Sequence, residues 1–200
     1  MKRGTIILIV VAALLLIFAM NGCSVYNNMV DKQEDVTRNW QQVENQYQRR
    51  SDLIPNLVAV VRNYADFEKS TLEAVVQARA NATRVTISPQ NLDADAIQKF
   101  DAAQSQVSTT LGRLLAVAEN YPNLKANQNF LDLQAQLEGT ENRIATERGR
   151  FNDVVKDYNA YVRKFPGRIW AGMFGFETHA YFESKEGADI VPDVNEAFKK

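Results

Sequence analysis

The sequence has 200 residues, of which 46% are hydrophobic and 24% are charged, and its formal net charge at pH 7 is -1. A chain this close to neutral has no electrostatic footprint for nucleic acid, so we expect no nucleic-acid partner. Cys23 is the only cysteine and His179 is the only histidine, which excludes intrachain disulfides and zinc sites built from these two residue types.

An unbroken apolar run from Ile6 to Met20 follows two cations, Lys2 and Arg3. With the tolerable residues at its borders, the run reaches about 20 residues, the length of a helix that crosses a hydrocarbon core of roughly 30 Å. Because the cations precede the run, the positive-inside rule predicts a cytoplasmic N-terminus. The rest of the chain is then on the non-cytoplasmic side.

The apolar run has two main interpretations. It is either an uncut transmembrane anchor or a signal that is cleaved before Cys23, where a bacterial lipoprotein carries its lipid. Gly22 supplies the small residue required before the cysteine, whereas Asn21 matches the usual pattern poorly. A buried helix of a soluble protein is a third alternative. We assign residues 1–23 as a transmembrane anchor or lipoprotein signal, with Cys23 as the lipidation candidate.

Apolar residues in steps of three and four predict helices through most of the chain after the run. The first stripe extends from Val36 to Arg79, with Arg50 at a polar position within it. Pro55 also lies within it. Because proline has no N–H to donate to the carbonyl of Ser51, we expect a kink or a break at this point.

A second helix is predicted from about Asp93 to the Tyr-Pro pair at 121–122, and a third from Phe130 to Phe165. Apolar faces of this length must be buried, and long helices with short connectors pack antiparallel. The predicted fold over residues 24–182 is therefore all-α: an antiparallel up-down bundle of three to four long helices, the first kinked near its proline.

The segment from Phe165 to Phe182 combines proline and glycine with many aromatic residues. We expect it to fold back over one end of the bundle, because such a stretch left in water risks aggregation. Two alternatives stay open: Trp170 and its neighbours dip into the membrane interface, or they meet another protein. Residues 183–200 are mostly polar and predict a loose tail.

Two motifs resemble those of a known family. Residues 49–58, RRSDLIPNLV, resemble the RRxDLIPNLV signature of the LemA family of bacterial membrane proteins. Residues 119–127, ENYPNLKAN, are similar to its E-x-YPxLKAN, and residues 151–166 resemble its C-terminal pattern. The resemblance covers about Tyr26 to Phe182. It implies an N-terminal membrane segment followed by a helical bundle, and it brings no established enzymatic activity.

The two motifs supply the candidate site residues. We interpret Asp52 as the N-cap of a helix that restarts at Pro55, with the nearby arginines paired with acids on a neighbouring helix or solvated. The alternative is a partner-binding surface, and the Tyr-Pro turn has the same two interpretations. The candidates for a structural or interaction role are Arg49, Arg50, Asp52, Pro55, Asn56, Tyr121, Pro122, Lys125 and Asn127.

We expect no catalytic, cofactor or metal site, because the sequence lacks Glu-x-x-His pairs, a nucleophile elbow and a phosphate loop. His179 is expected to be an ordinary solvated histidine. The predicted function is a membrane-anchored, non-enzymatic interaction or scaffold protein of the bacterial cell envelope, with membrane lipid and envelope proteins as partners. The alternatives are a regulator of an envelope enzyme such as a membrane peptidase, and an enzyme using carboxylates such as Asp52, Glu119 or Glu141.

Overall fold

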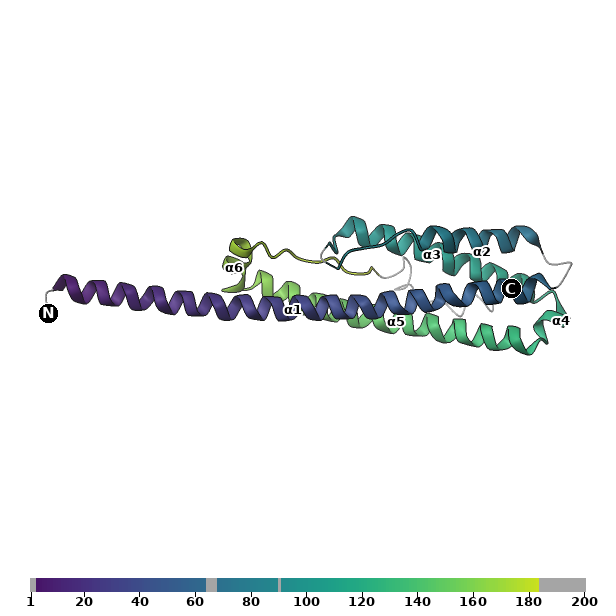
Figure 1. Ribbon diagram of the computed structural model, residues 1–200, viewed down its shortest axis with the longest axis horizontal. Helices are drawn as coiled ribbons and strands as arrows, with labels where there is room; N and C mark the ends of the chain where they lie inside the picture. The colour runs from purple at the N-terminus through teal and green to yellow at the C-terminus, as the bar shows by residue number, and fades with distance from the viewer. Residues whose placement is uncertain (1–2, 64–67, 90, 184–200) are drawn as a thin grey trace, which may run out of the picture.

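The computed structural model describes residues 3–63, 68–89 and 91–183, and over these residues it contains six helices and no strand. The helices are α1 (Arg3–Arg62), α2 (Lys69–Ala82), α3 (Ala94–Ala118), α4 (Pro122–Lys125), α5 (Gln128–Arg163) and α6 (Gly167–Phe174). Figure 1 shows an elongated bundle from which the N-terminal part of α1 projects as a single helix. The all-α bundle predicted from the sequence is confirmed.

Helix α1 is continuous over 60 residues, which corresponds to about 90 Å at 1.5 Å per residue. Its first part is apolar and exposed, whereas from Gly22 onward it contributes buried residues in steps of three and four, with one step of seven between Met29 and Val36. The apolar part is long and hydrophobic enough to cross a membrane by length and composition, a test that a signal sequence also passes. No linker separates this part from the bundle.

Helix α1 does not break at Pro55. It runs through the proline to Arg62, so of the expected kink or break, the break is wrong. Within the bundle α1 packs mainly against α5, and α2 packs mainly against α3. The stripe that continues from Val36 to Arg79 in the sequence is therefore divided between two helices.

Side-chain caps begin α3 and α5. Asp93 accepts a hydrogen bond from the N–H of Ala96 at 2.7 Å, and Asn127 accepts one from the N–H of Phe130 at 3.1 Å. Pro122 lies in the first turn of α4, where its missing N–H costs nothing. The predicted helix starts near Asp93 and Pro122 are confirmed.

The buried side chains form two cores, one after the other along the bundle. The proximal core, next to the projecting part of α1, consists of Val25, Met29, Val36, Trp40, Val43, Tyr47, Ile87, Leu92, Ile97, Phe100, Ile144, Phe151, Val155, Tyr158, Val162, Trp170, Ala171 and Phe182. The distal core consists of Ile54, Leu57, Val61, Leu72, Val75, Ala78, Ala82, Val107, Leu111, Leu114, Ala118, Leu124, Phe130 and Leu137.

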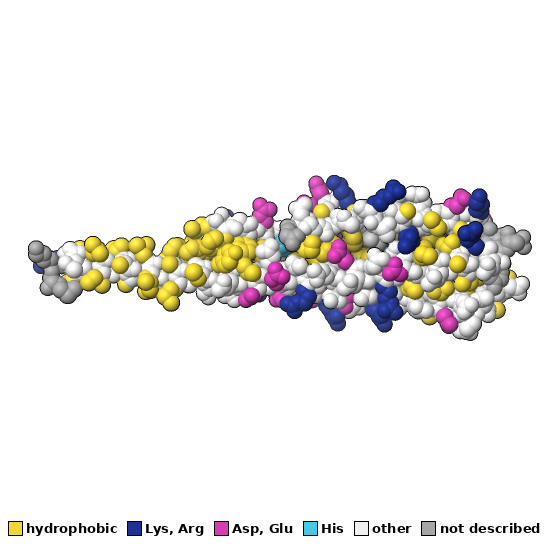
Figure 2. Space-filling model, in the orientation of Figure 1, with side chains coloured by type: hydrophobic (Ala, Val, Ile, Leu, Met, Phe, Trp, Pro, Cys, Tyr) yellow, Lys and Arg dark blue, Asp and Glu magenta, His cyan; other side chains and the backbone are white. Residues whose placement is uncertain are grey.

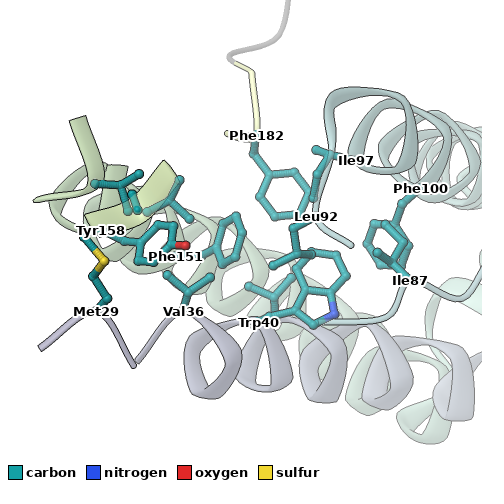
Figure 3. Close-up of a cluster of buried hydrophobic side chains, with 14 of the residues drawn as sticks. Met29, Val36, Trp40, Ile87, Leu92, Ile97, Phe100, Phe151, Tyr158 and Phe182 are labelled. Atoms are coloured by element: carbon teal, nitrogen blue, oxygen red, sulfur yellow. The ribbon is translucent and has the colours of Figure 1, made fainter. Parts of the chain in front are cut away.

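Trp40 occupies the middle of the proximal core. Its ring centroid lies 5.2 Å from that of Phe100, 5.5 Å from that of Phe151 and 5.9 Å from that of Phe182. Figure 3 shows Phe182 reaching onto this cluster from the chain beyond α6. The aromatic segment therefore folds back onto the bundle, as the first of the three interpretations predicted.

Candidate functional site

A polar layer separates the two cores. On each of the three longest helices, one buried polar residue lies between a residue of the proximal core and a residue of the distal core. These residues are Arg50 on α1, Gln104 on α3 and Thr140 on α5. Because the three positions lie at the same level of the bundle, the interruptions of the apolar stripes coincide in one cross-section.

Arg50 holds this layer together. It is only 1% exposed, and its Nη1 donates to Ser108 Oγ at 2.7 Å and to Glu141 Oε1 at 2.6 Å. Its Nη2 donates to the carbonyl oxygen of Gln104 at 3.0 Å and to Gln104 Oε1 at 2.7 Å. The guanidinium also lies 5.1 Å from the ring centroid of Tyr47. A buried charge needs such pairing, and the predicted pairing with an acid on another helix is confirmed for this arginine.

Arg79 of α2 satisfies the backbone group that Pro55 leaves unpaired. The carbonyl of Ser51 would accept a hydrogen bond from the N–H of residue 55 in an uninterrupted helix, but proline has none. Arg79 Nε donates to this carbonyl at 2.8 Å, which also ties α2 to α1. Since no helix begins at Pro55, the interpretation of Asp52 as an N-cap is wrong. Its carboxylate accepts instead from Gln48 Nε2 at 2.7 Å.

We expect Arg79→Met to lower the free energy of unfolding by about 1–2 kcal/mol, because it leaves the Ser51 carbonyl without a donor. In a Pro55→Ala background the helix regains its own N–H, so the same change should cost less. Chemical denaturation of the wild type, both single variants and the double variant gives the coupling, which we expect to be about 1 kcal/mol. If Arg79→Met lowered the free energy of unfolding equally in both backgrounds, the hydrogen bond from Arg79 to the Ser51 carbonyl would not replace the one that Pro55 lacks.

The turn between α3 and α5 closes the distal end of the bundle and holds the second motif (Figure 1). Asn127 caps α5, and Lys125 forms an exposed ion pair with Glu119. Leu124 of this motif and Leu57 of the first motif both belong to the distal core. The two motifs thus share apolar contacts, while their polar residues serve different parts of the bundle.

Arg49, Asp52 and Asn56 are exposed on α1. Their spacing of three and four residues places them on one face of the helix, away from the face that Arg50 turns into the polar layer. The structure therefore divides the first motif: Arg50 is buried in the polar layer, whereas these three side chains are exposed.

Two asparagines of α5 that sequence reasoning did not single out hold the chain beyond α6. Asn159 donates to the carbonyl of His179 at 2.8 Å and accepts from its N–H at 2.9 Å. Asn152 does the same with Phe182, at 2.9 Å in both directions. Seven helical residues rise by about 10.5 Å and three extended residues span about 10 Å, so both pairs form together. We call residues 176–183 the strap.

Arg148 of α5 adds a further contact to the strap. Its guanidinium carbon lies 4.4 Å from the ring centroid of Phe182, and Nη2 donates to the carbonyl of Glu183 at 3.3 Å. Its Nη1 donates to Asp101 of α3 at 2.6 Å. This ion pair and the one made by Arg50 border a hollow between α1, α3 and α5. The charges lining the hollow are thus largely neutralised by one another.

The LemA family model matches residues 39–195 of the sequence. This chain belongs to the LemA family. The match begins within α1, after the apolar segment, and includes the polar layer, the distal turn and the strap. Both motifs named in the sequence lie within the matched residues.

Curated relatives carry two kinds of name. The chain is 28% identical to the magnetosome protein MamQ 2 of Paramagnetospirillum magneticum over 181 residues, covering 82% of this chain and 66% of the relative. It is 27% identical to MamQ of Magnetospirillum gryphiswaldense over 189 residues, 84% of this chain and 70% of the relative. Protein LemA of Metamycoplasma hominis is 22% identical over 170 residues, 85% of this chain and 74% of the relative. The chain therefore spans about two thirds of the length of these relatives.

The LemA bundle does not bring together the three carboxylates considered for catalysis. Glu141 pairs with Arg50 in the polar layer, whereas Glu119 pairs with Lys125 at the distal end and Asp52 bonds to Gln48 on α1. Acid–base catalysis by two carboxylates requires that they face one cleft. Among the described residues, no group of three or more His, Cys, Asp and Glu is placed to hold a metal ion.

His179 is buried rather than solvated, so this expectation is wrong. The strap lays its imidazole against the ring of Tyr158, with a centroid distance of 4.8 Å, and buries both. Burial lowers the pKa of His179 below its ordinary value of 6.5, because it disfavours the charged form. Burial, and secondarily the charge of Glu177, raises the pKa of Tyr158 to about 12. The hydroxyl of Tyr158 donates to the carbonyl of Glu177 at 2.8 Å.

Acidification is expected to weaken the fold through His179. Above pH 6.5 the imidazole is neutral in both states; below it, the unfolded chain binds a proton that the folded chain resists. The free energy of unfolding therefore falls with pH until the lowered folded-state pKa is passed. We expect denaturation between about pH 7 and pH 5 to show a smaller fall for His179→Gln than for the wild type. The carboxyl of Glu44, whose pKa burial raises, titrates in both proteins and cancels. Identical pH profiles would contradict this assignment.

Proposed function

We propose that this chain is a membrane-anchored interaction or scaffold protein of the bacterial envelope, without catalytic activity of its own. The continuity of α1 carries the proposal, because one helix supplies both the apolar segment and a central element of the bundle. From Val25 to Arg62 this helix extends about 55 Å. We call this part of α1 the stalk. Because it continues the apolar segment without a break, it holds the sides and the distal end of the bundle at a fixed height above the membrane.

The bundle is proposed to face the non-cytoplasmic side. Lys2 and Arg3 precede the apolar segment, and the positive-inside rule keeps such cations in the cytoplasm. A protease added to spheroplasts should then digest the bundle, whereas digestion only after lysis would reverse the orientation.

We favour an uncut anchor over a lipoprotein. The ring of Trp170 packs on Phe18, with a centroid distance of 4.6 Å, and a methyl group placed on Gly22 would lie only 2.5 Å from it. Both partners precede Cys23, so cleavage there would remove the surface against which this buried tryptophan packs. The intact mass of the mature protein is expected to include the residues before Cys23. A mass that begins at a lipid-modified Cys23 would overturn this part of the proposal.

The exposed face of α1 formed by Arg49, Asp52 and Asn56 is the proposed partner surface. The polar layer does not use these side chains, and they lie in the distal half of the stalk, about 36–47 Å from Val25, within reach of other envelope proteins. A photo-crosslinking amino acid placed at 52 or 56 in growing cells should give discrete protein adducts. The control is position 143, where Arg143 is also exposed, but on α5.

The crosslinking outcomes separate the scaffold from other functions. Adducts at 52 and 56 that are absent at 143 support a specific partner on this face. Equal labelling at all three positions, or none, would remove the proposed surface. Identifying an enzyme among the adducts would favour the regulator interpretation over a passive scaffold.

A further inference from the structure

Exposed apolar side chains gather around α6. Besides the run from Ile6 to Met20, the large hydrophobic side chains that remain exposed among the described residues are few. They are Tyr26, Val76, Leu131, Phe165, Ile169, Met173, Phe174 and Tyr181. Five of these eight lie on α6 (Ile169, Met173 and Phe174), two residues before it (Phe165) or on the part of α1 beside it (Tyr26). Figure 2 shows this apolar patch continuing directly from the apolar surface of α1.

Apart from Arg168, the exposed side chains of α6 are apolar. Its Trp170 and Ala171 are buried against the bundle, whereas Ile169 and Met173 point outward and are 49% and 64% exposed. Phe165, just before the helix, is 84% exposed. A surface helix of a protein in water normally turns polar residues outward. The exposed side of α6 is therefore suited to an apolar environment rather than to water.

Aromatic contacts fix α6 beside the anchor. Trp170 packs on Phe18 within the apolar run, and the ring of Phe174 lies 5.0 Å from that of Tyr26. Trp170 and Phe174 also stack on each other, with a centroid distance of 5.8 Å. These contacts connect α6 to the last turns of the anchor.

The depth of α6 follows from these contacts. If about 20 residues ending near Ser24 cross the hydrocarbon core, Phe18 lies about 9 Å inside its outer border. A side chain packed on Phe18 and Gly22 is then below the headgroups or level with them. Tryptophan and tyrosine favour this zone, where the ring is in lipid and its polar atom reaches water.

We propose that α6, together with Phe165, is a second membrane-contacting element that is seated in the interfacial zone of the leaflet in which the anchor ends. The inference rests on the membrane anchoring of the proposed function. Lipid is the occupant because the patch continues the surface of the anchor itself and lies at its depth. Lys164 and Arg168 are exposed beside the patch and reach the headgroups by extending their long side chains.

The second contact would fix the tilt of the bundle relative to the membrane and its rotation about the anchor axis. A lone helix allows the stalk to tilt and to spin about the anchor axis, whereas a helix seated beside it restricts both motions. The strap keeps α6 in position, because it follows directly after this helix and is bonded to α5 through Asn152 and Asn159. The proximal end of the bundle would thus contact the membrane as well as contain the proximal core.

Nitroxide labels on the full-length protein test this proposal. In a Cys23→Ser background, single cysteines at positions 169 and 173 are labelled after reconstitution into phosphatidylcholine vesicles. A label at 76 is the matched control, since Val76 is as exposed as Ile169 but lies on α2. A label at 12 reports on the anchor. Collision rates with oxygen and with a water-soluble nickel complex give the depth of each label.

We expect the labels at 169 and 173 to collide preferentially with oxygen, by several-fold relative to the label at 76. Labels at 169 and 173 that behave like the label at 76, with the label at 12 in lipid, would overturn the second contact alone. A label at 12 in water would instead overturn the anchoring itself. Spin–spin broadening at 169 without oxygen preference would show a second copy in place of lipid, and would also overturn the proposal.

Discussion

Replacing Arg50 by alanine is expected to lower the free energy of unfolding by about 3–5 kcal/mol, the largest effect of any single polar substitution in this bundle. The side chain makes four hydrogen bonds to α3 and α5 from an almost fully buried position. Its removal leaves a cavity between the two cores and takes from the buried side chain of Gln104 its hydrogen-bond donor. Chemical denaturation in detergent micelles measures the loss.

Arg49→Ala is the matched control for this prediction. It removes the same side chain from the next residue of α1, where the arginine is exposed, and should change the free energy of unfolding by no more than about 0.5 kcal/mol. Arg50→Met, which fills the volume without the charge, should fall between the two. Similar losses for Arg49→Ala and Arg50→Ala would mean that the polar layer contributes nothing specific.

Replacing Asn152 and Asn159 together by alanine is expected to release the strap at a cost of about 2–4 kcal/mol. Four backbone groups of His179 and Phe182 lose their partners, and Trp40 loses the ring that covers it. Hydrogen exchange at the amides of His179 and Phe182 should rise steeply, while exchange in the distal core should change little.

Asn142→Ala provides the comparison, since Asn142 is an exposed asparagine on the same helix. It should leave exchange in the strap unchanged. Each single variant, Asn152→Ala or Asn159→Ala, should release the strap only in part, because the other pair still holds it. Full release by either one alone would show that the two pairs are not independent. An intact strap in the double variant would contradict its proposed attachment.

Periodicity was enough to predict the helices and most of the cores. Burial follows the steps of three and four, and the one polar position in the first stripe, Arg50, proved to be buried with partners on two other helices. The resemblance to the LemA family was carried by the motif around Pro55 and by the turn at 119–127. Both the family and the fold class were therefore accessible from the sequence.

The path of the chain after Pro55 was not accessible. Proline's missing N–H is a local rule that predicts a break, but Arg79, 28 residues after Ser51, donates to the carbonyl that the proline leaves unpaired. Apolar spacing does not reveal such a partner, and it continues through the connection from α1 to α2 almost in step. The end of α1 at Arg62 could not be predicted, because the apolar spacing does not change there.

The strap was missed because its attachment is between side chains and backbone. His179 was predicted to be solvated because it lies late in the chain, and nothing local indicates that Asn159 bonds to its main chain. The only available signal was the spacing of two asparagines, seven residues apart, on the inner face of a helix. That spacing indicates an attachment site only when the structure shows an extended segment beside the helix.

Because α1 is one continuous helix, it fixes the rotation of the apolar segment about the helix axis relative to the bundle. Inserting one residue between Tyr26 and Met29 would turn the apolar segment by about 100° relative to the bundle and lengthen the stalk by 1.5 Å. Trp170 would then face a different side of the segment. Inserting seven residues, nearly two whole turns, would return the phase to within about 20° while raising the bundle by about 10 Å. Rotation and height can thus be varied almost independently in this protein, by counting residues in one helix.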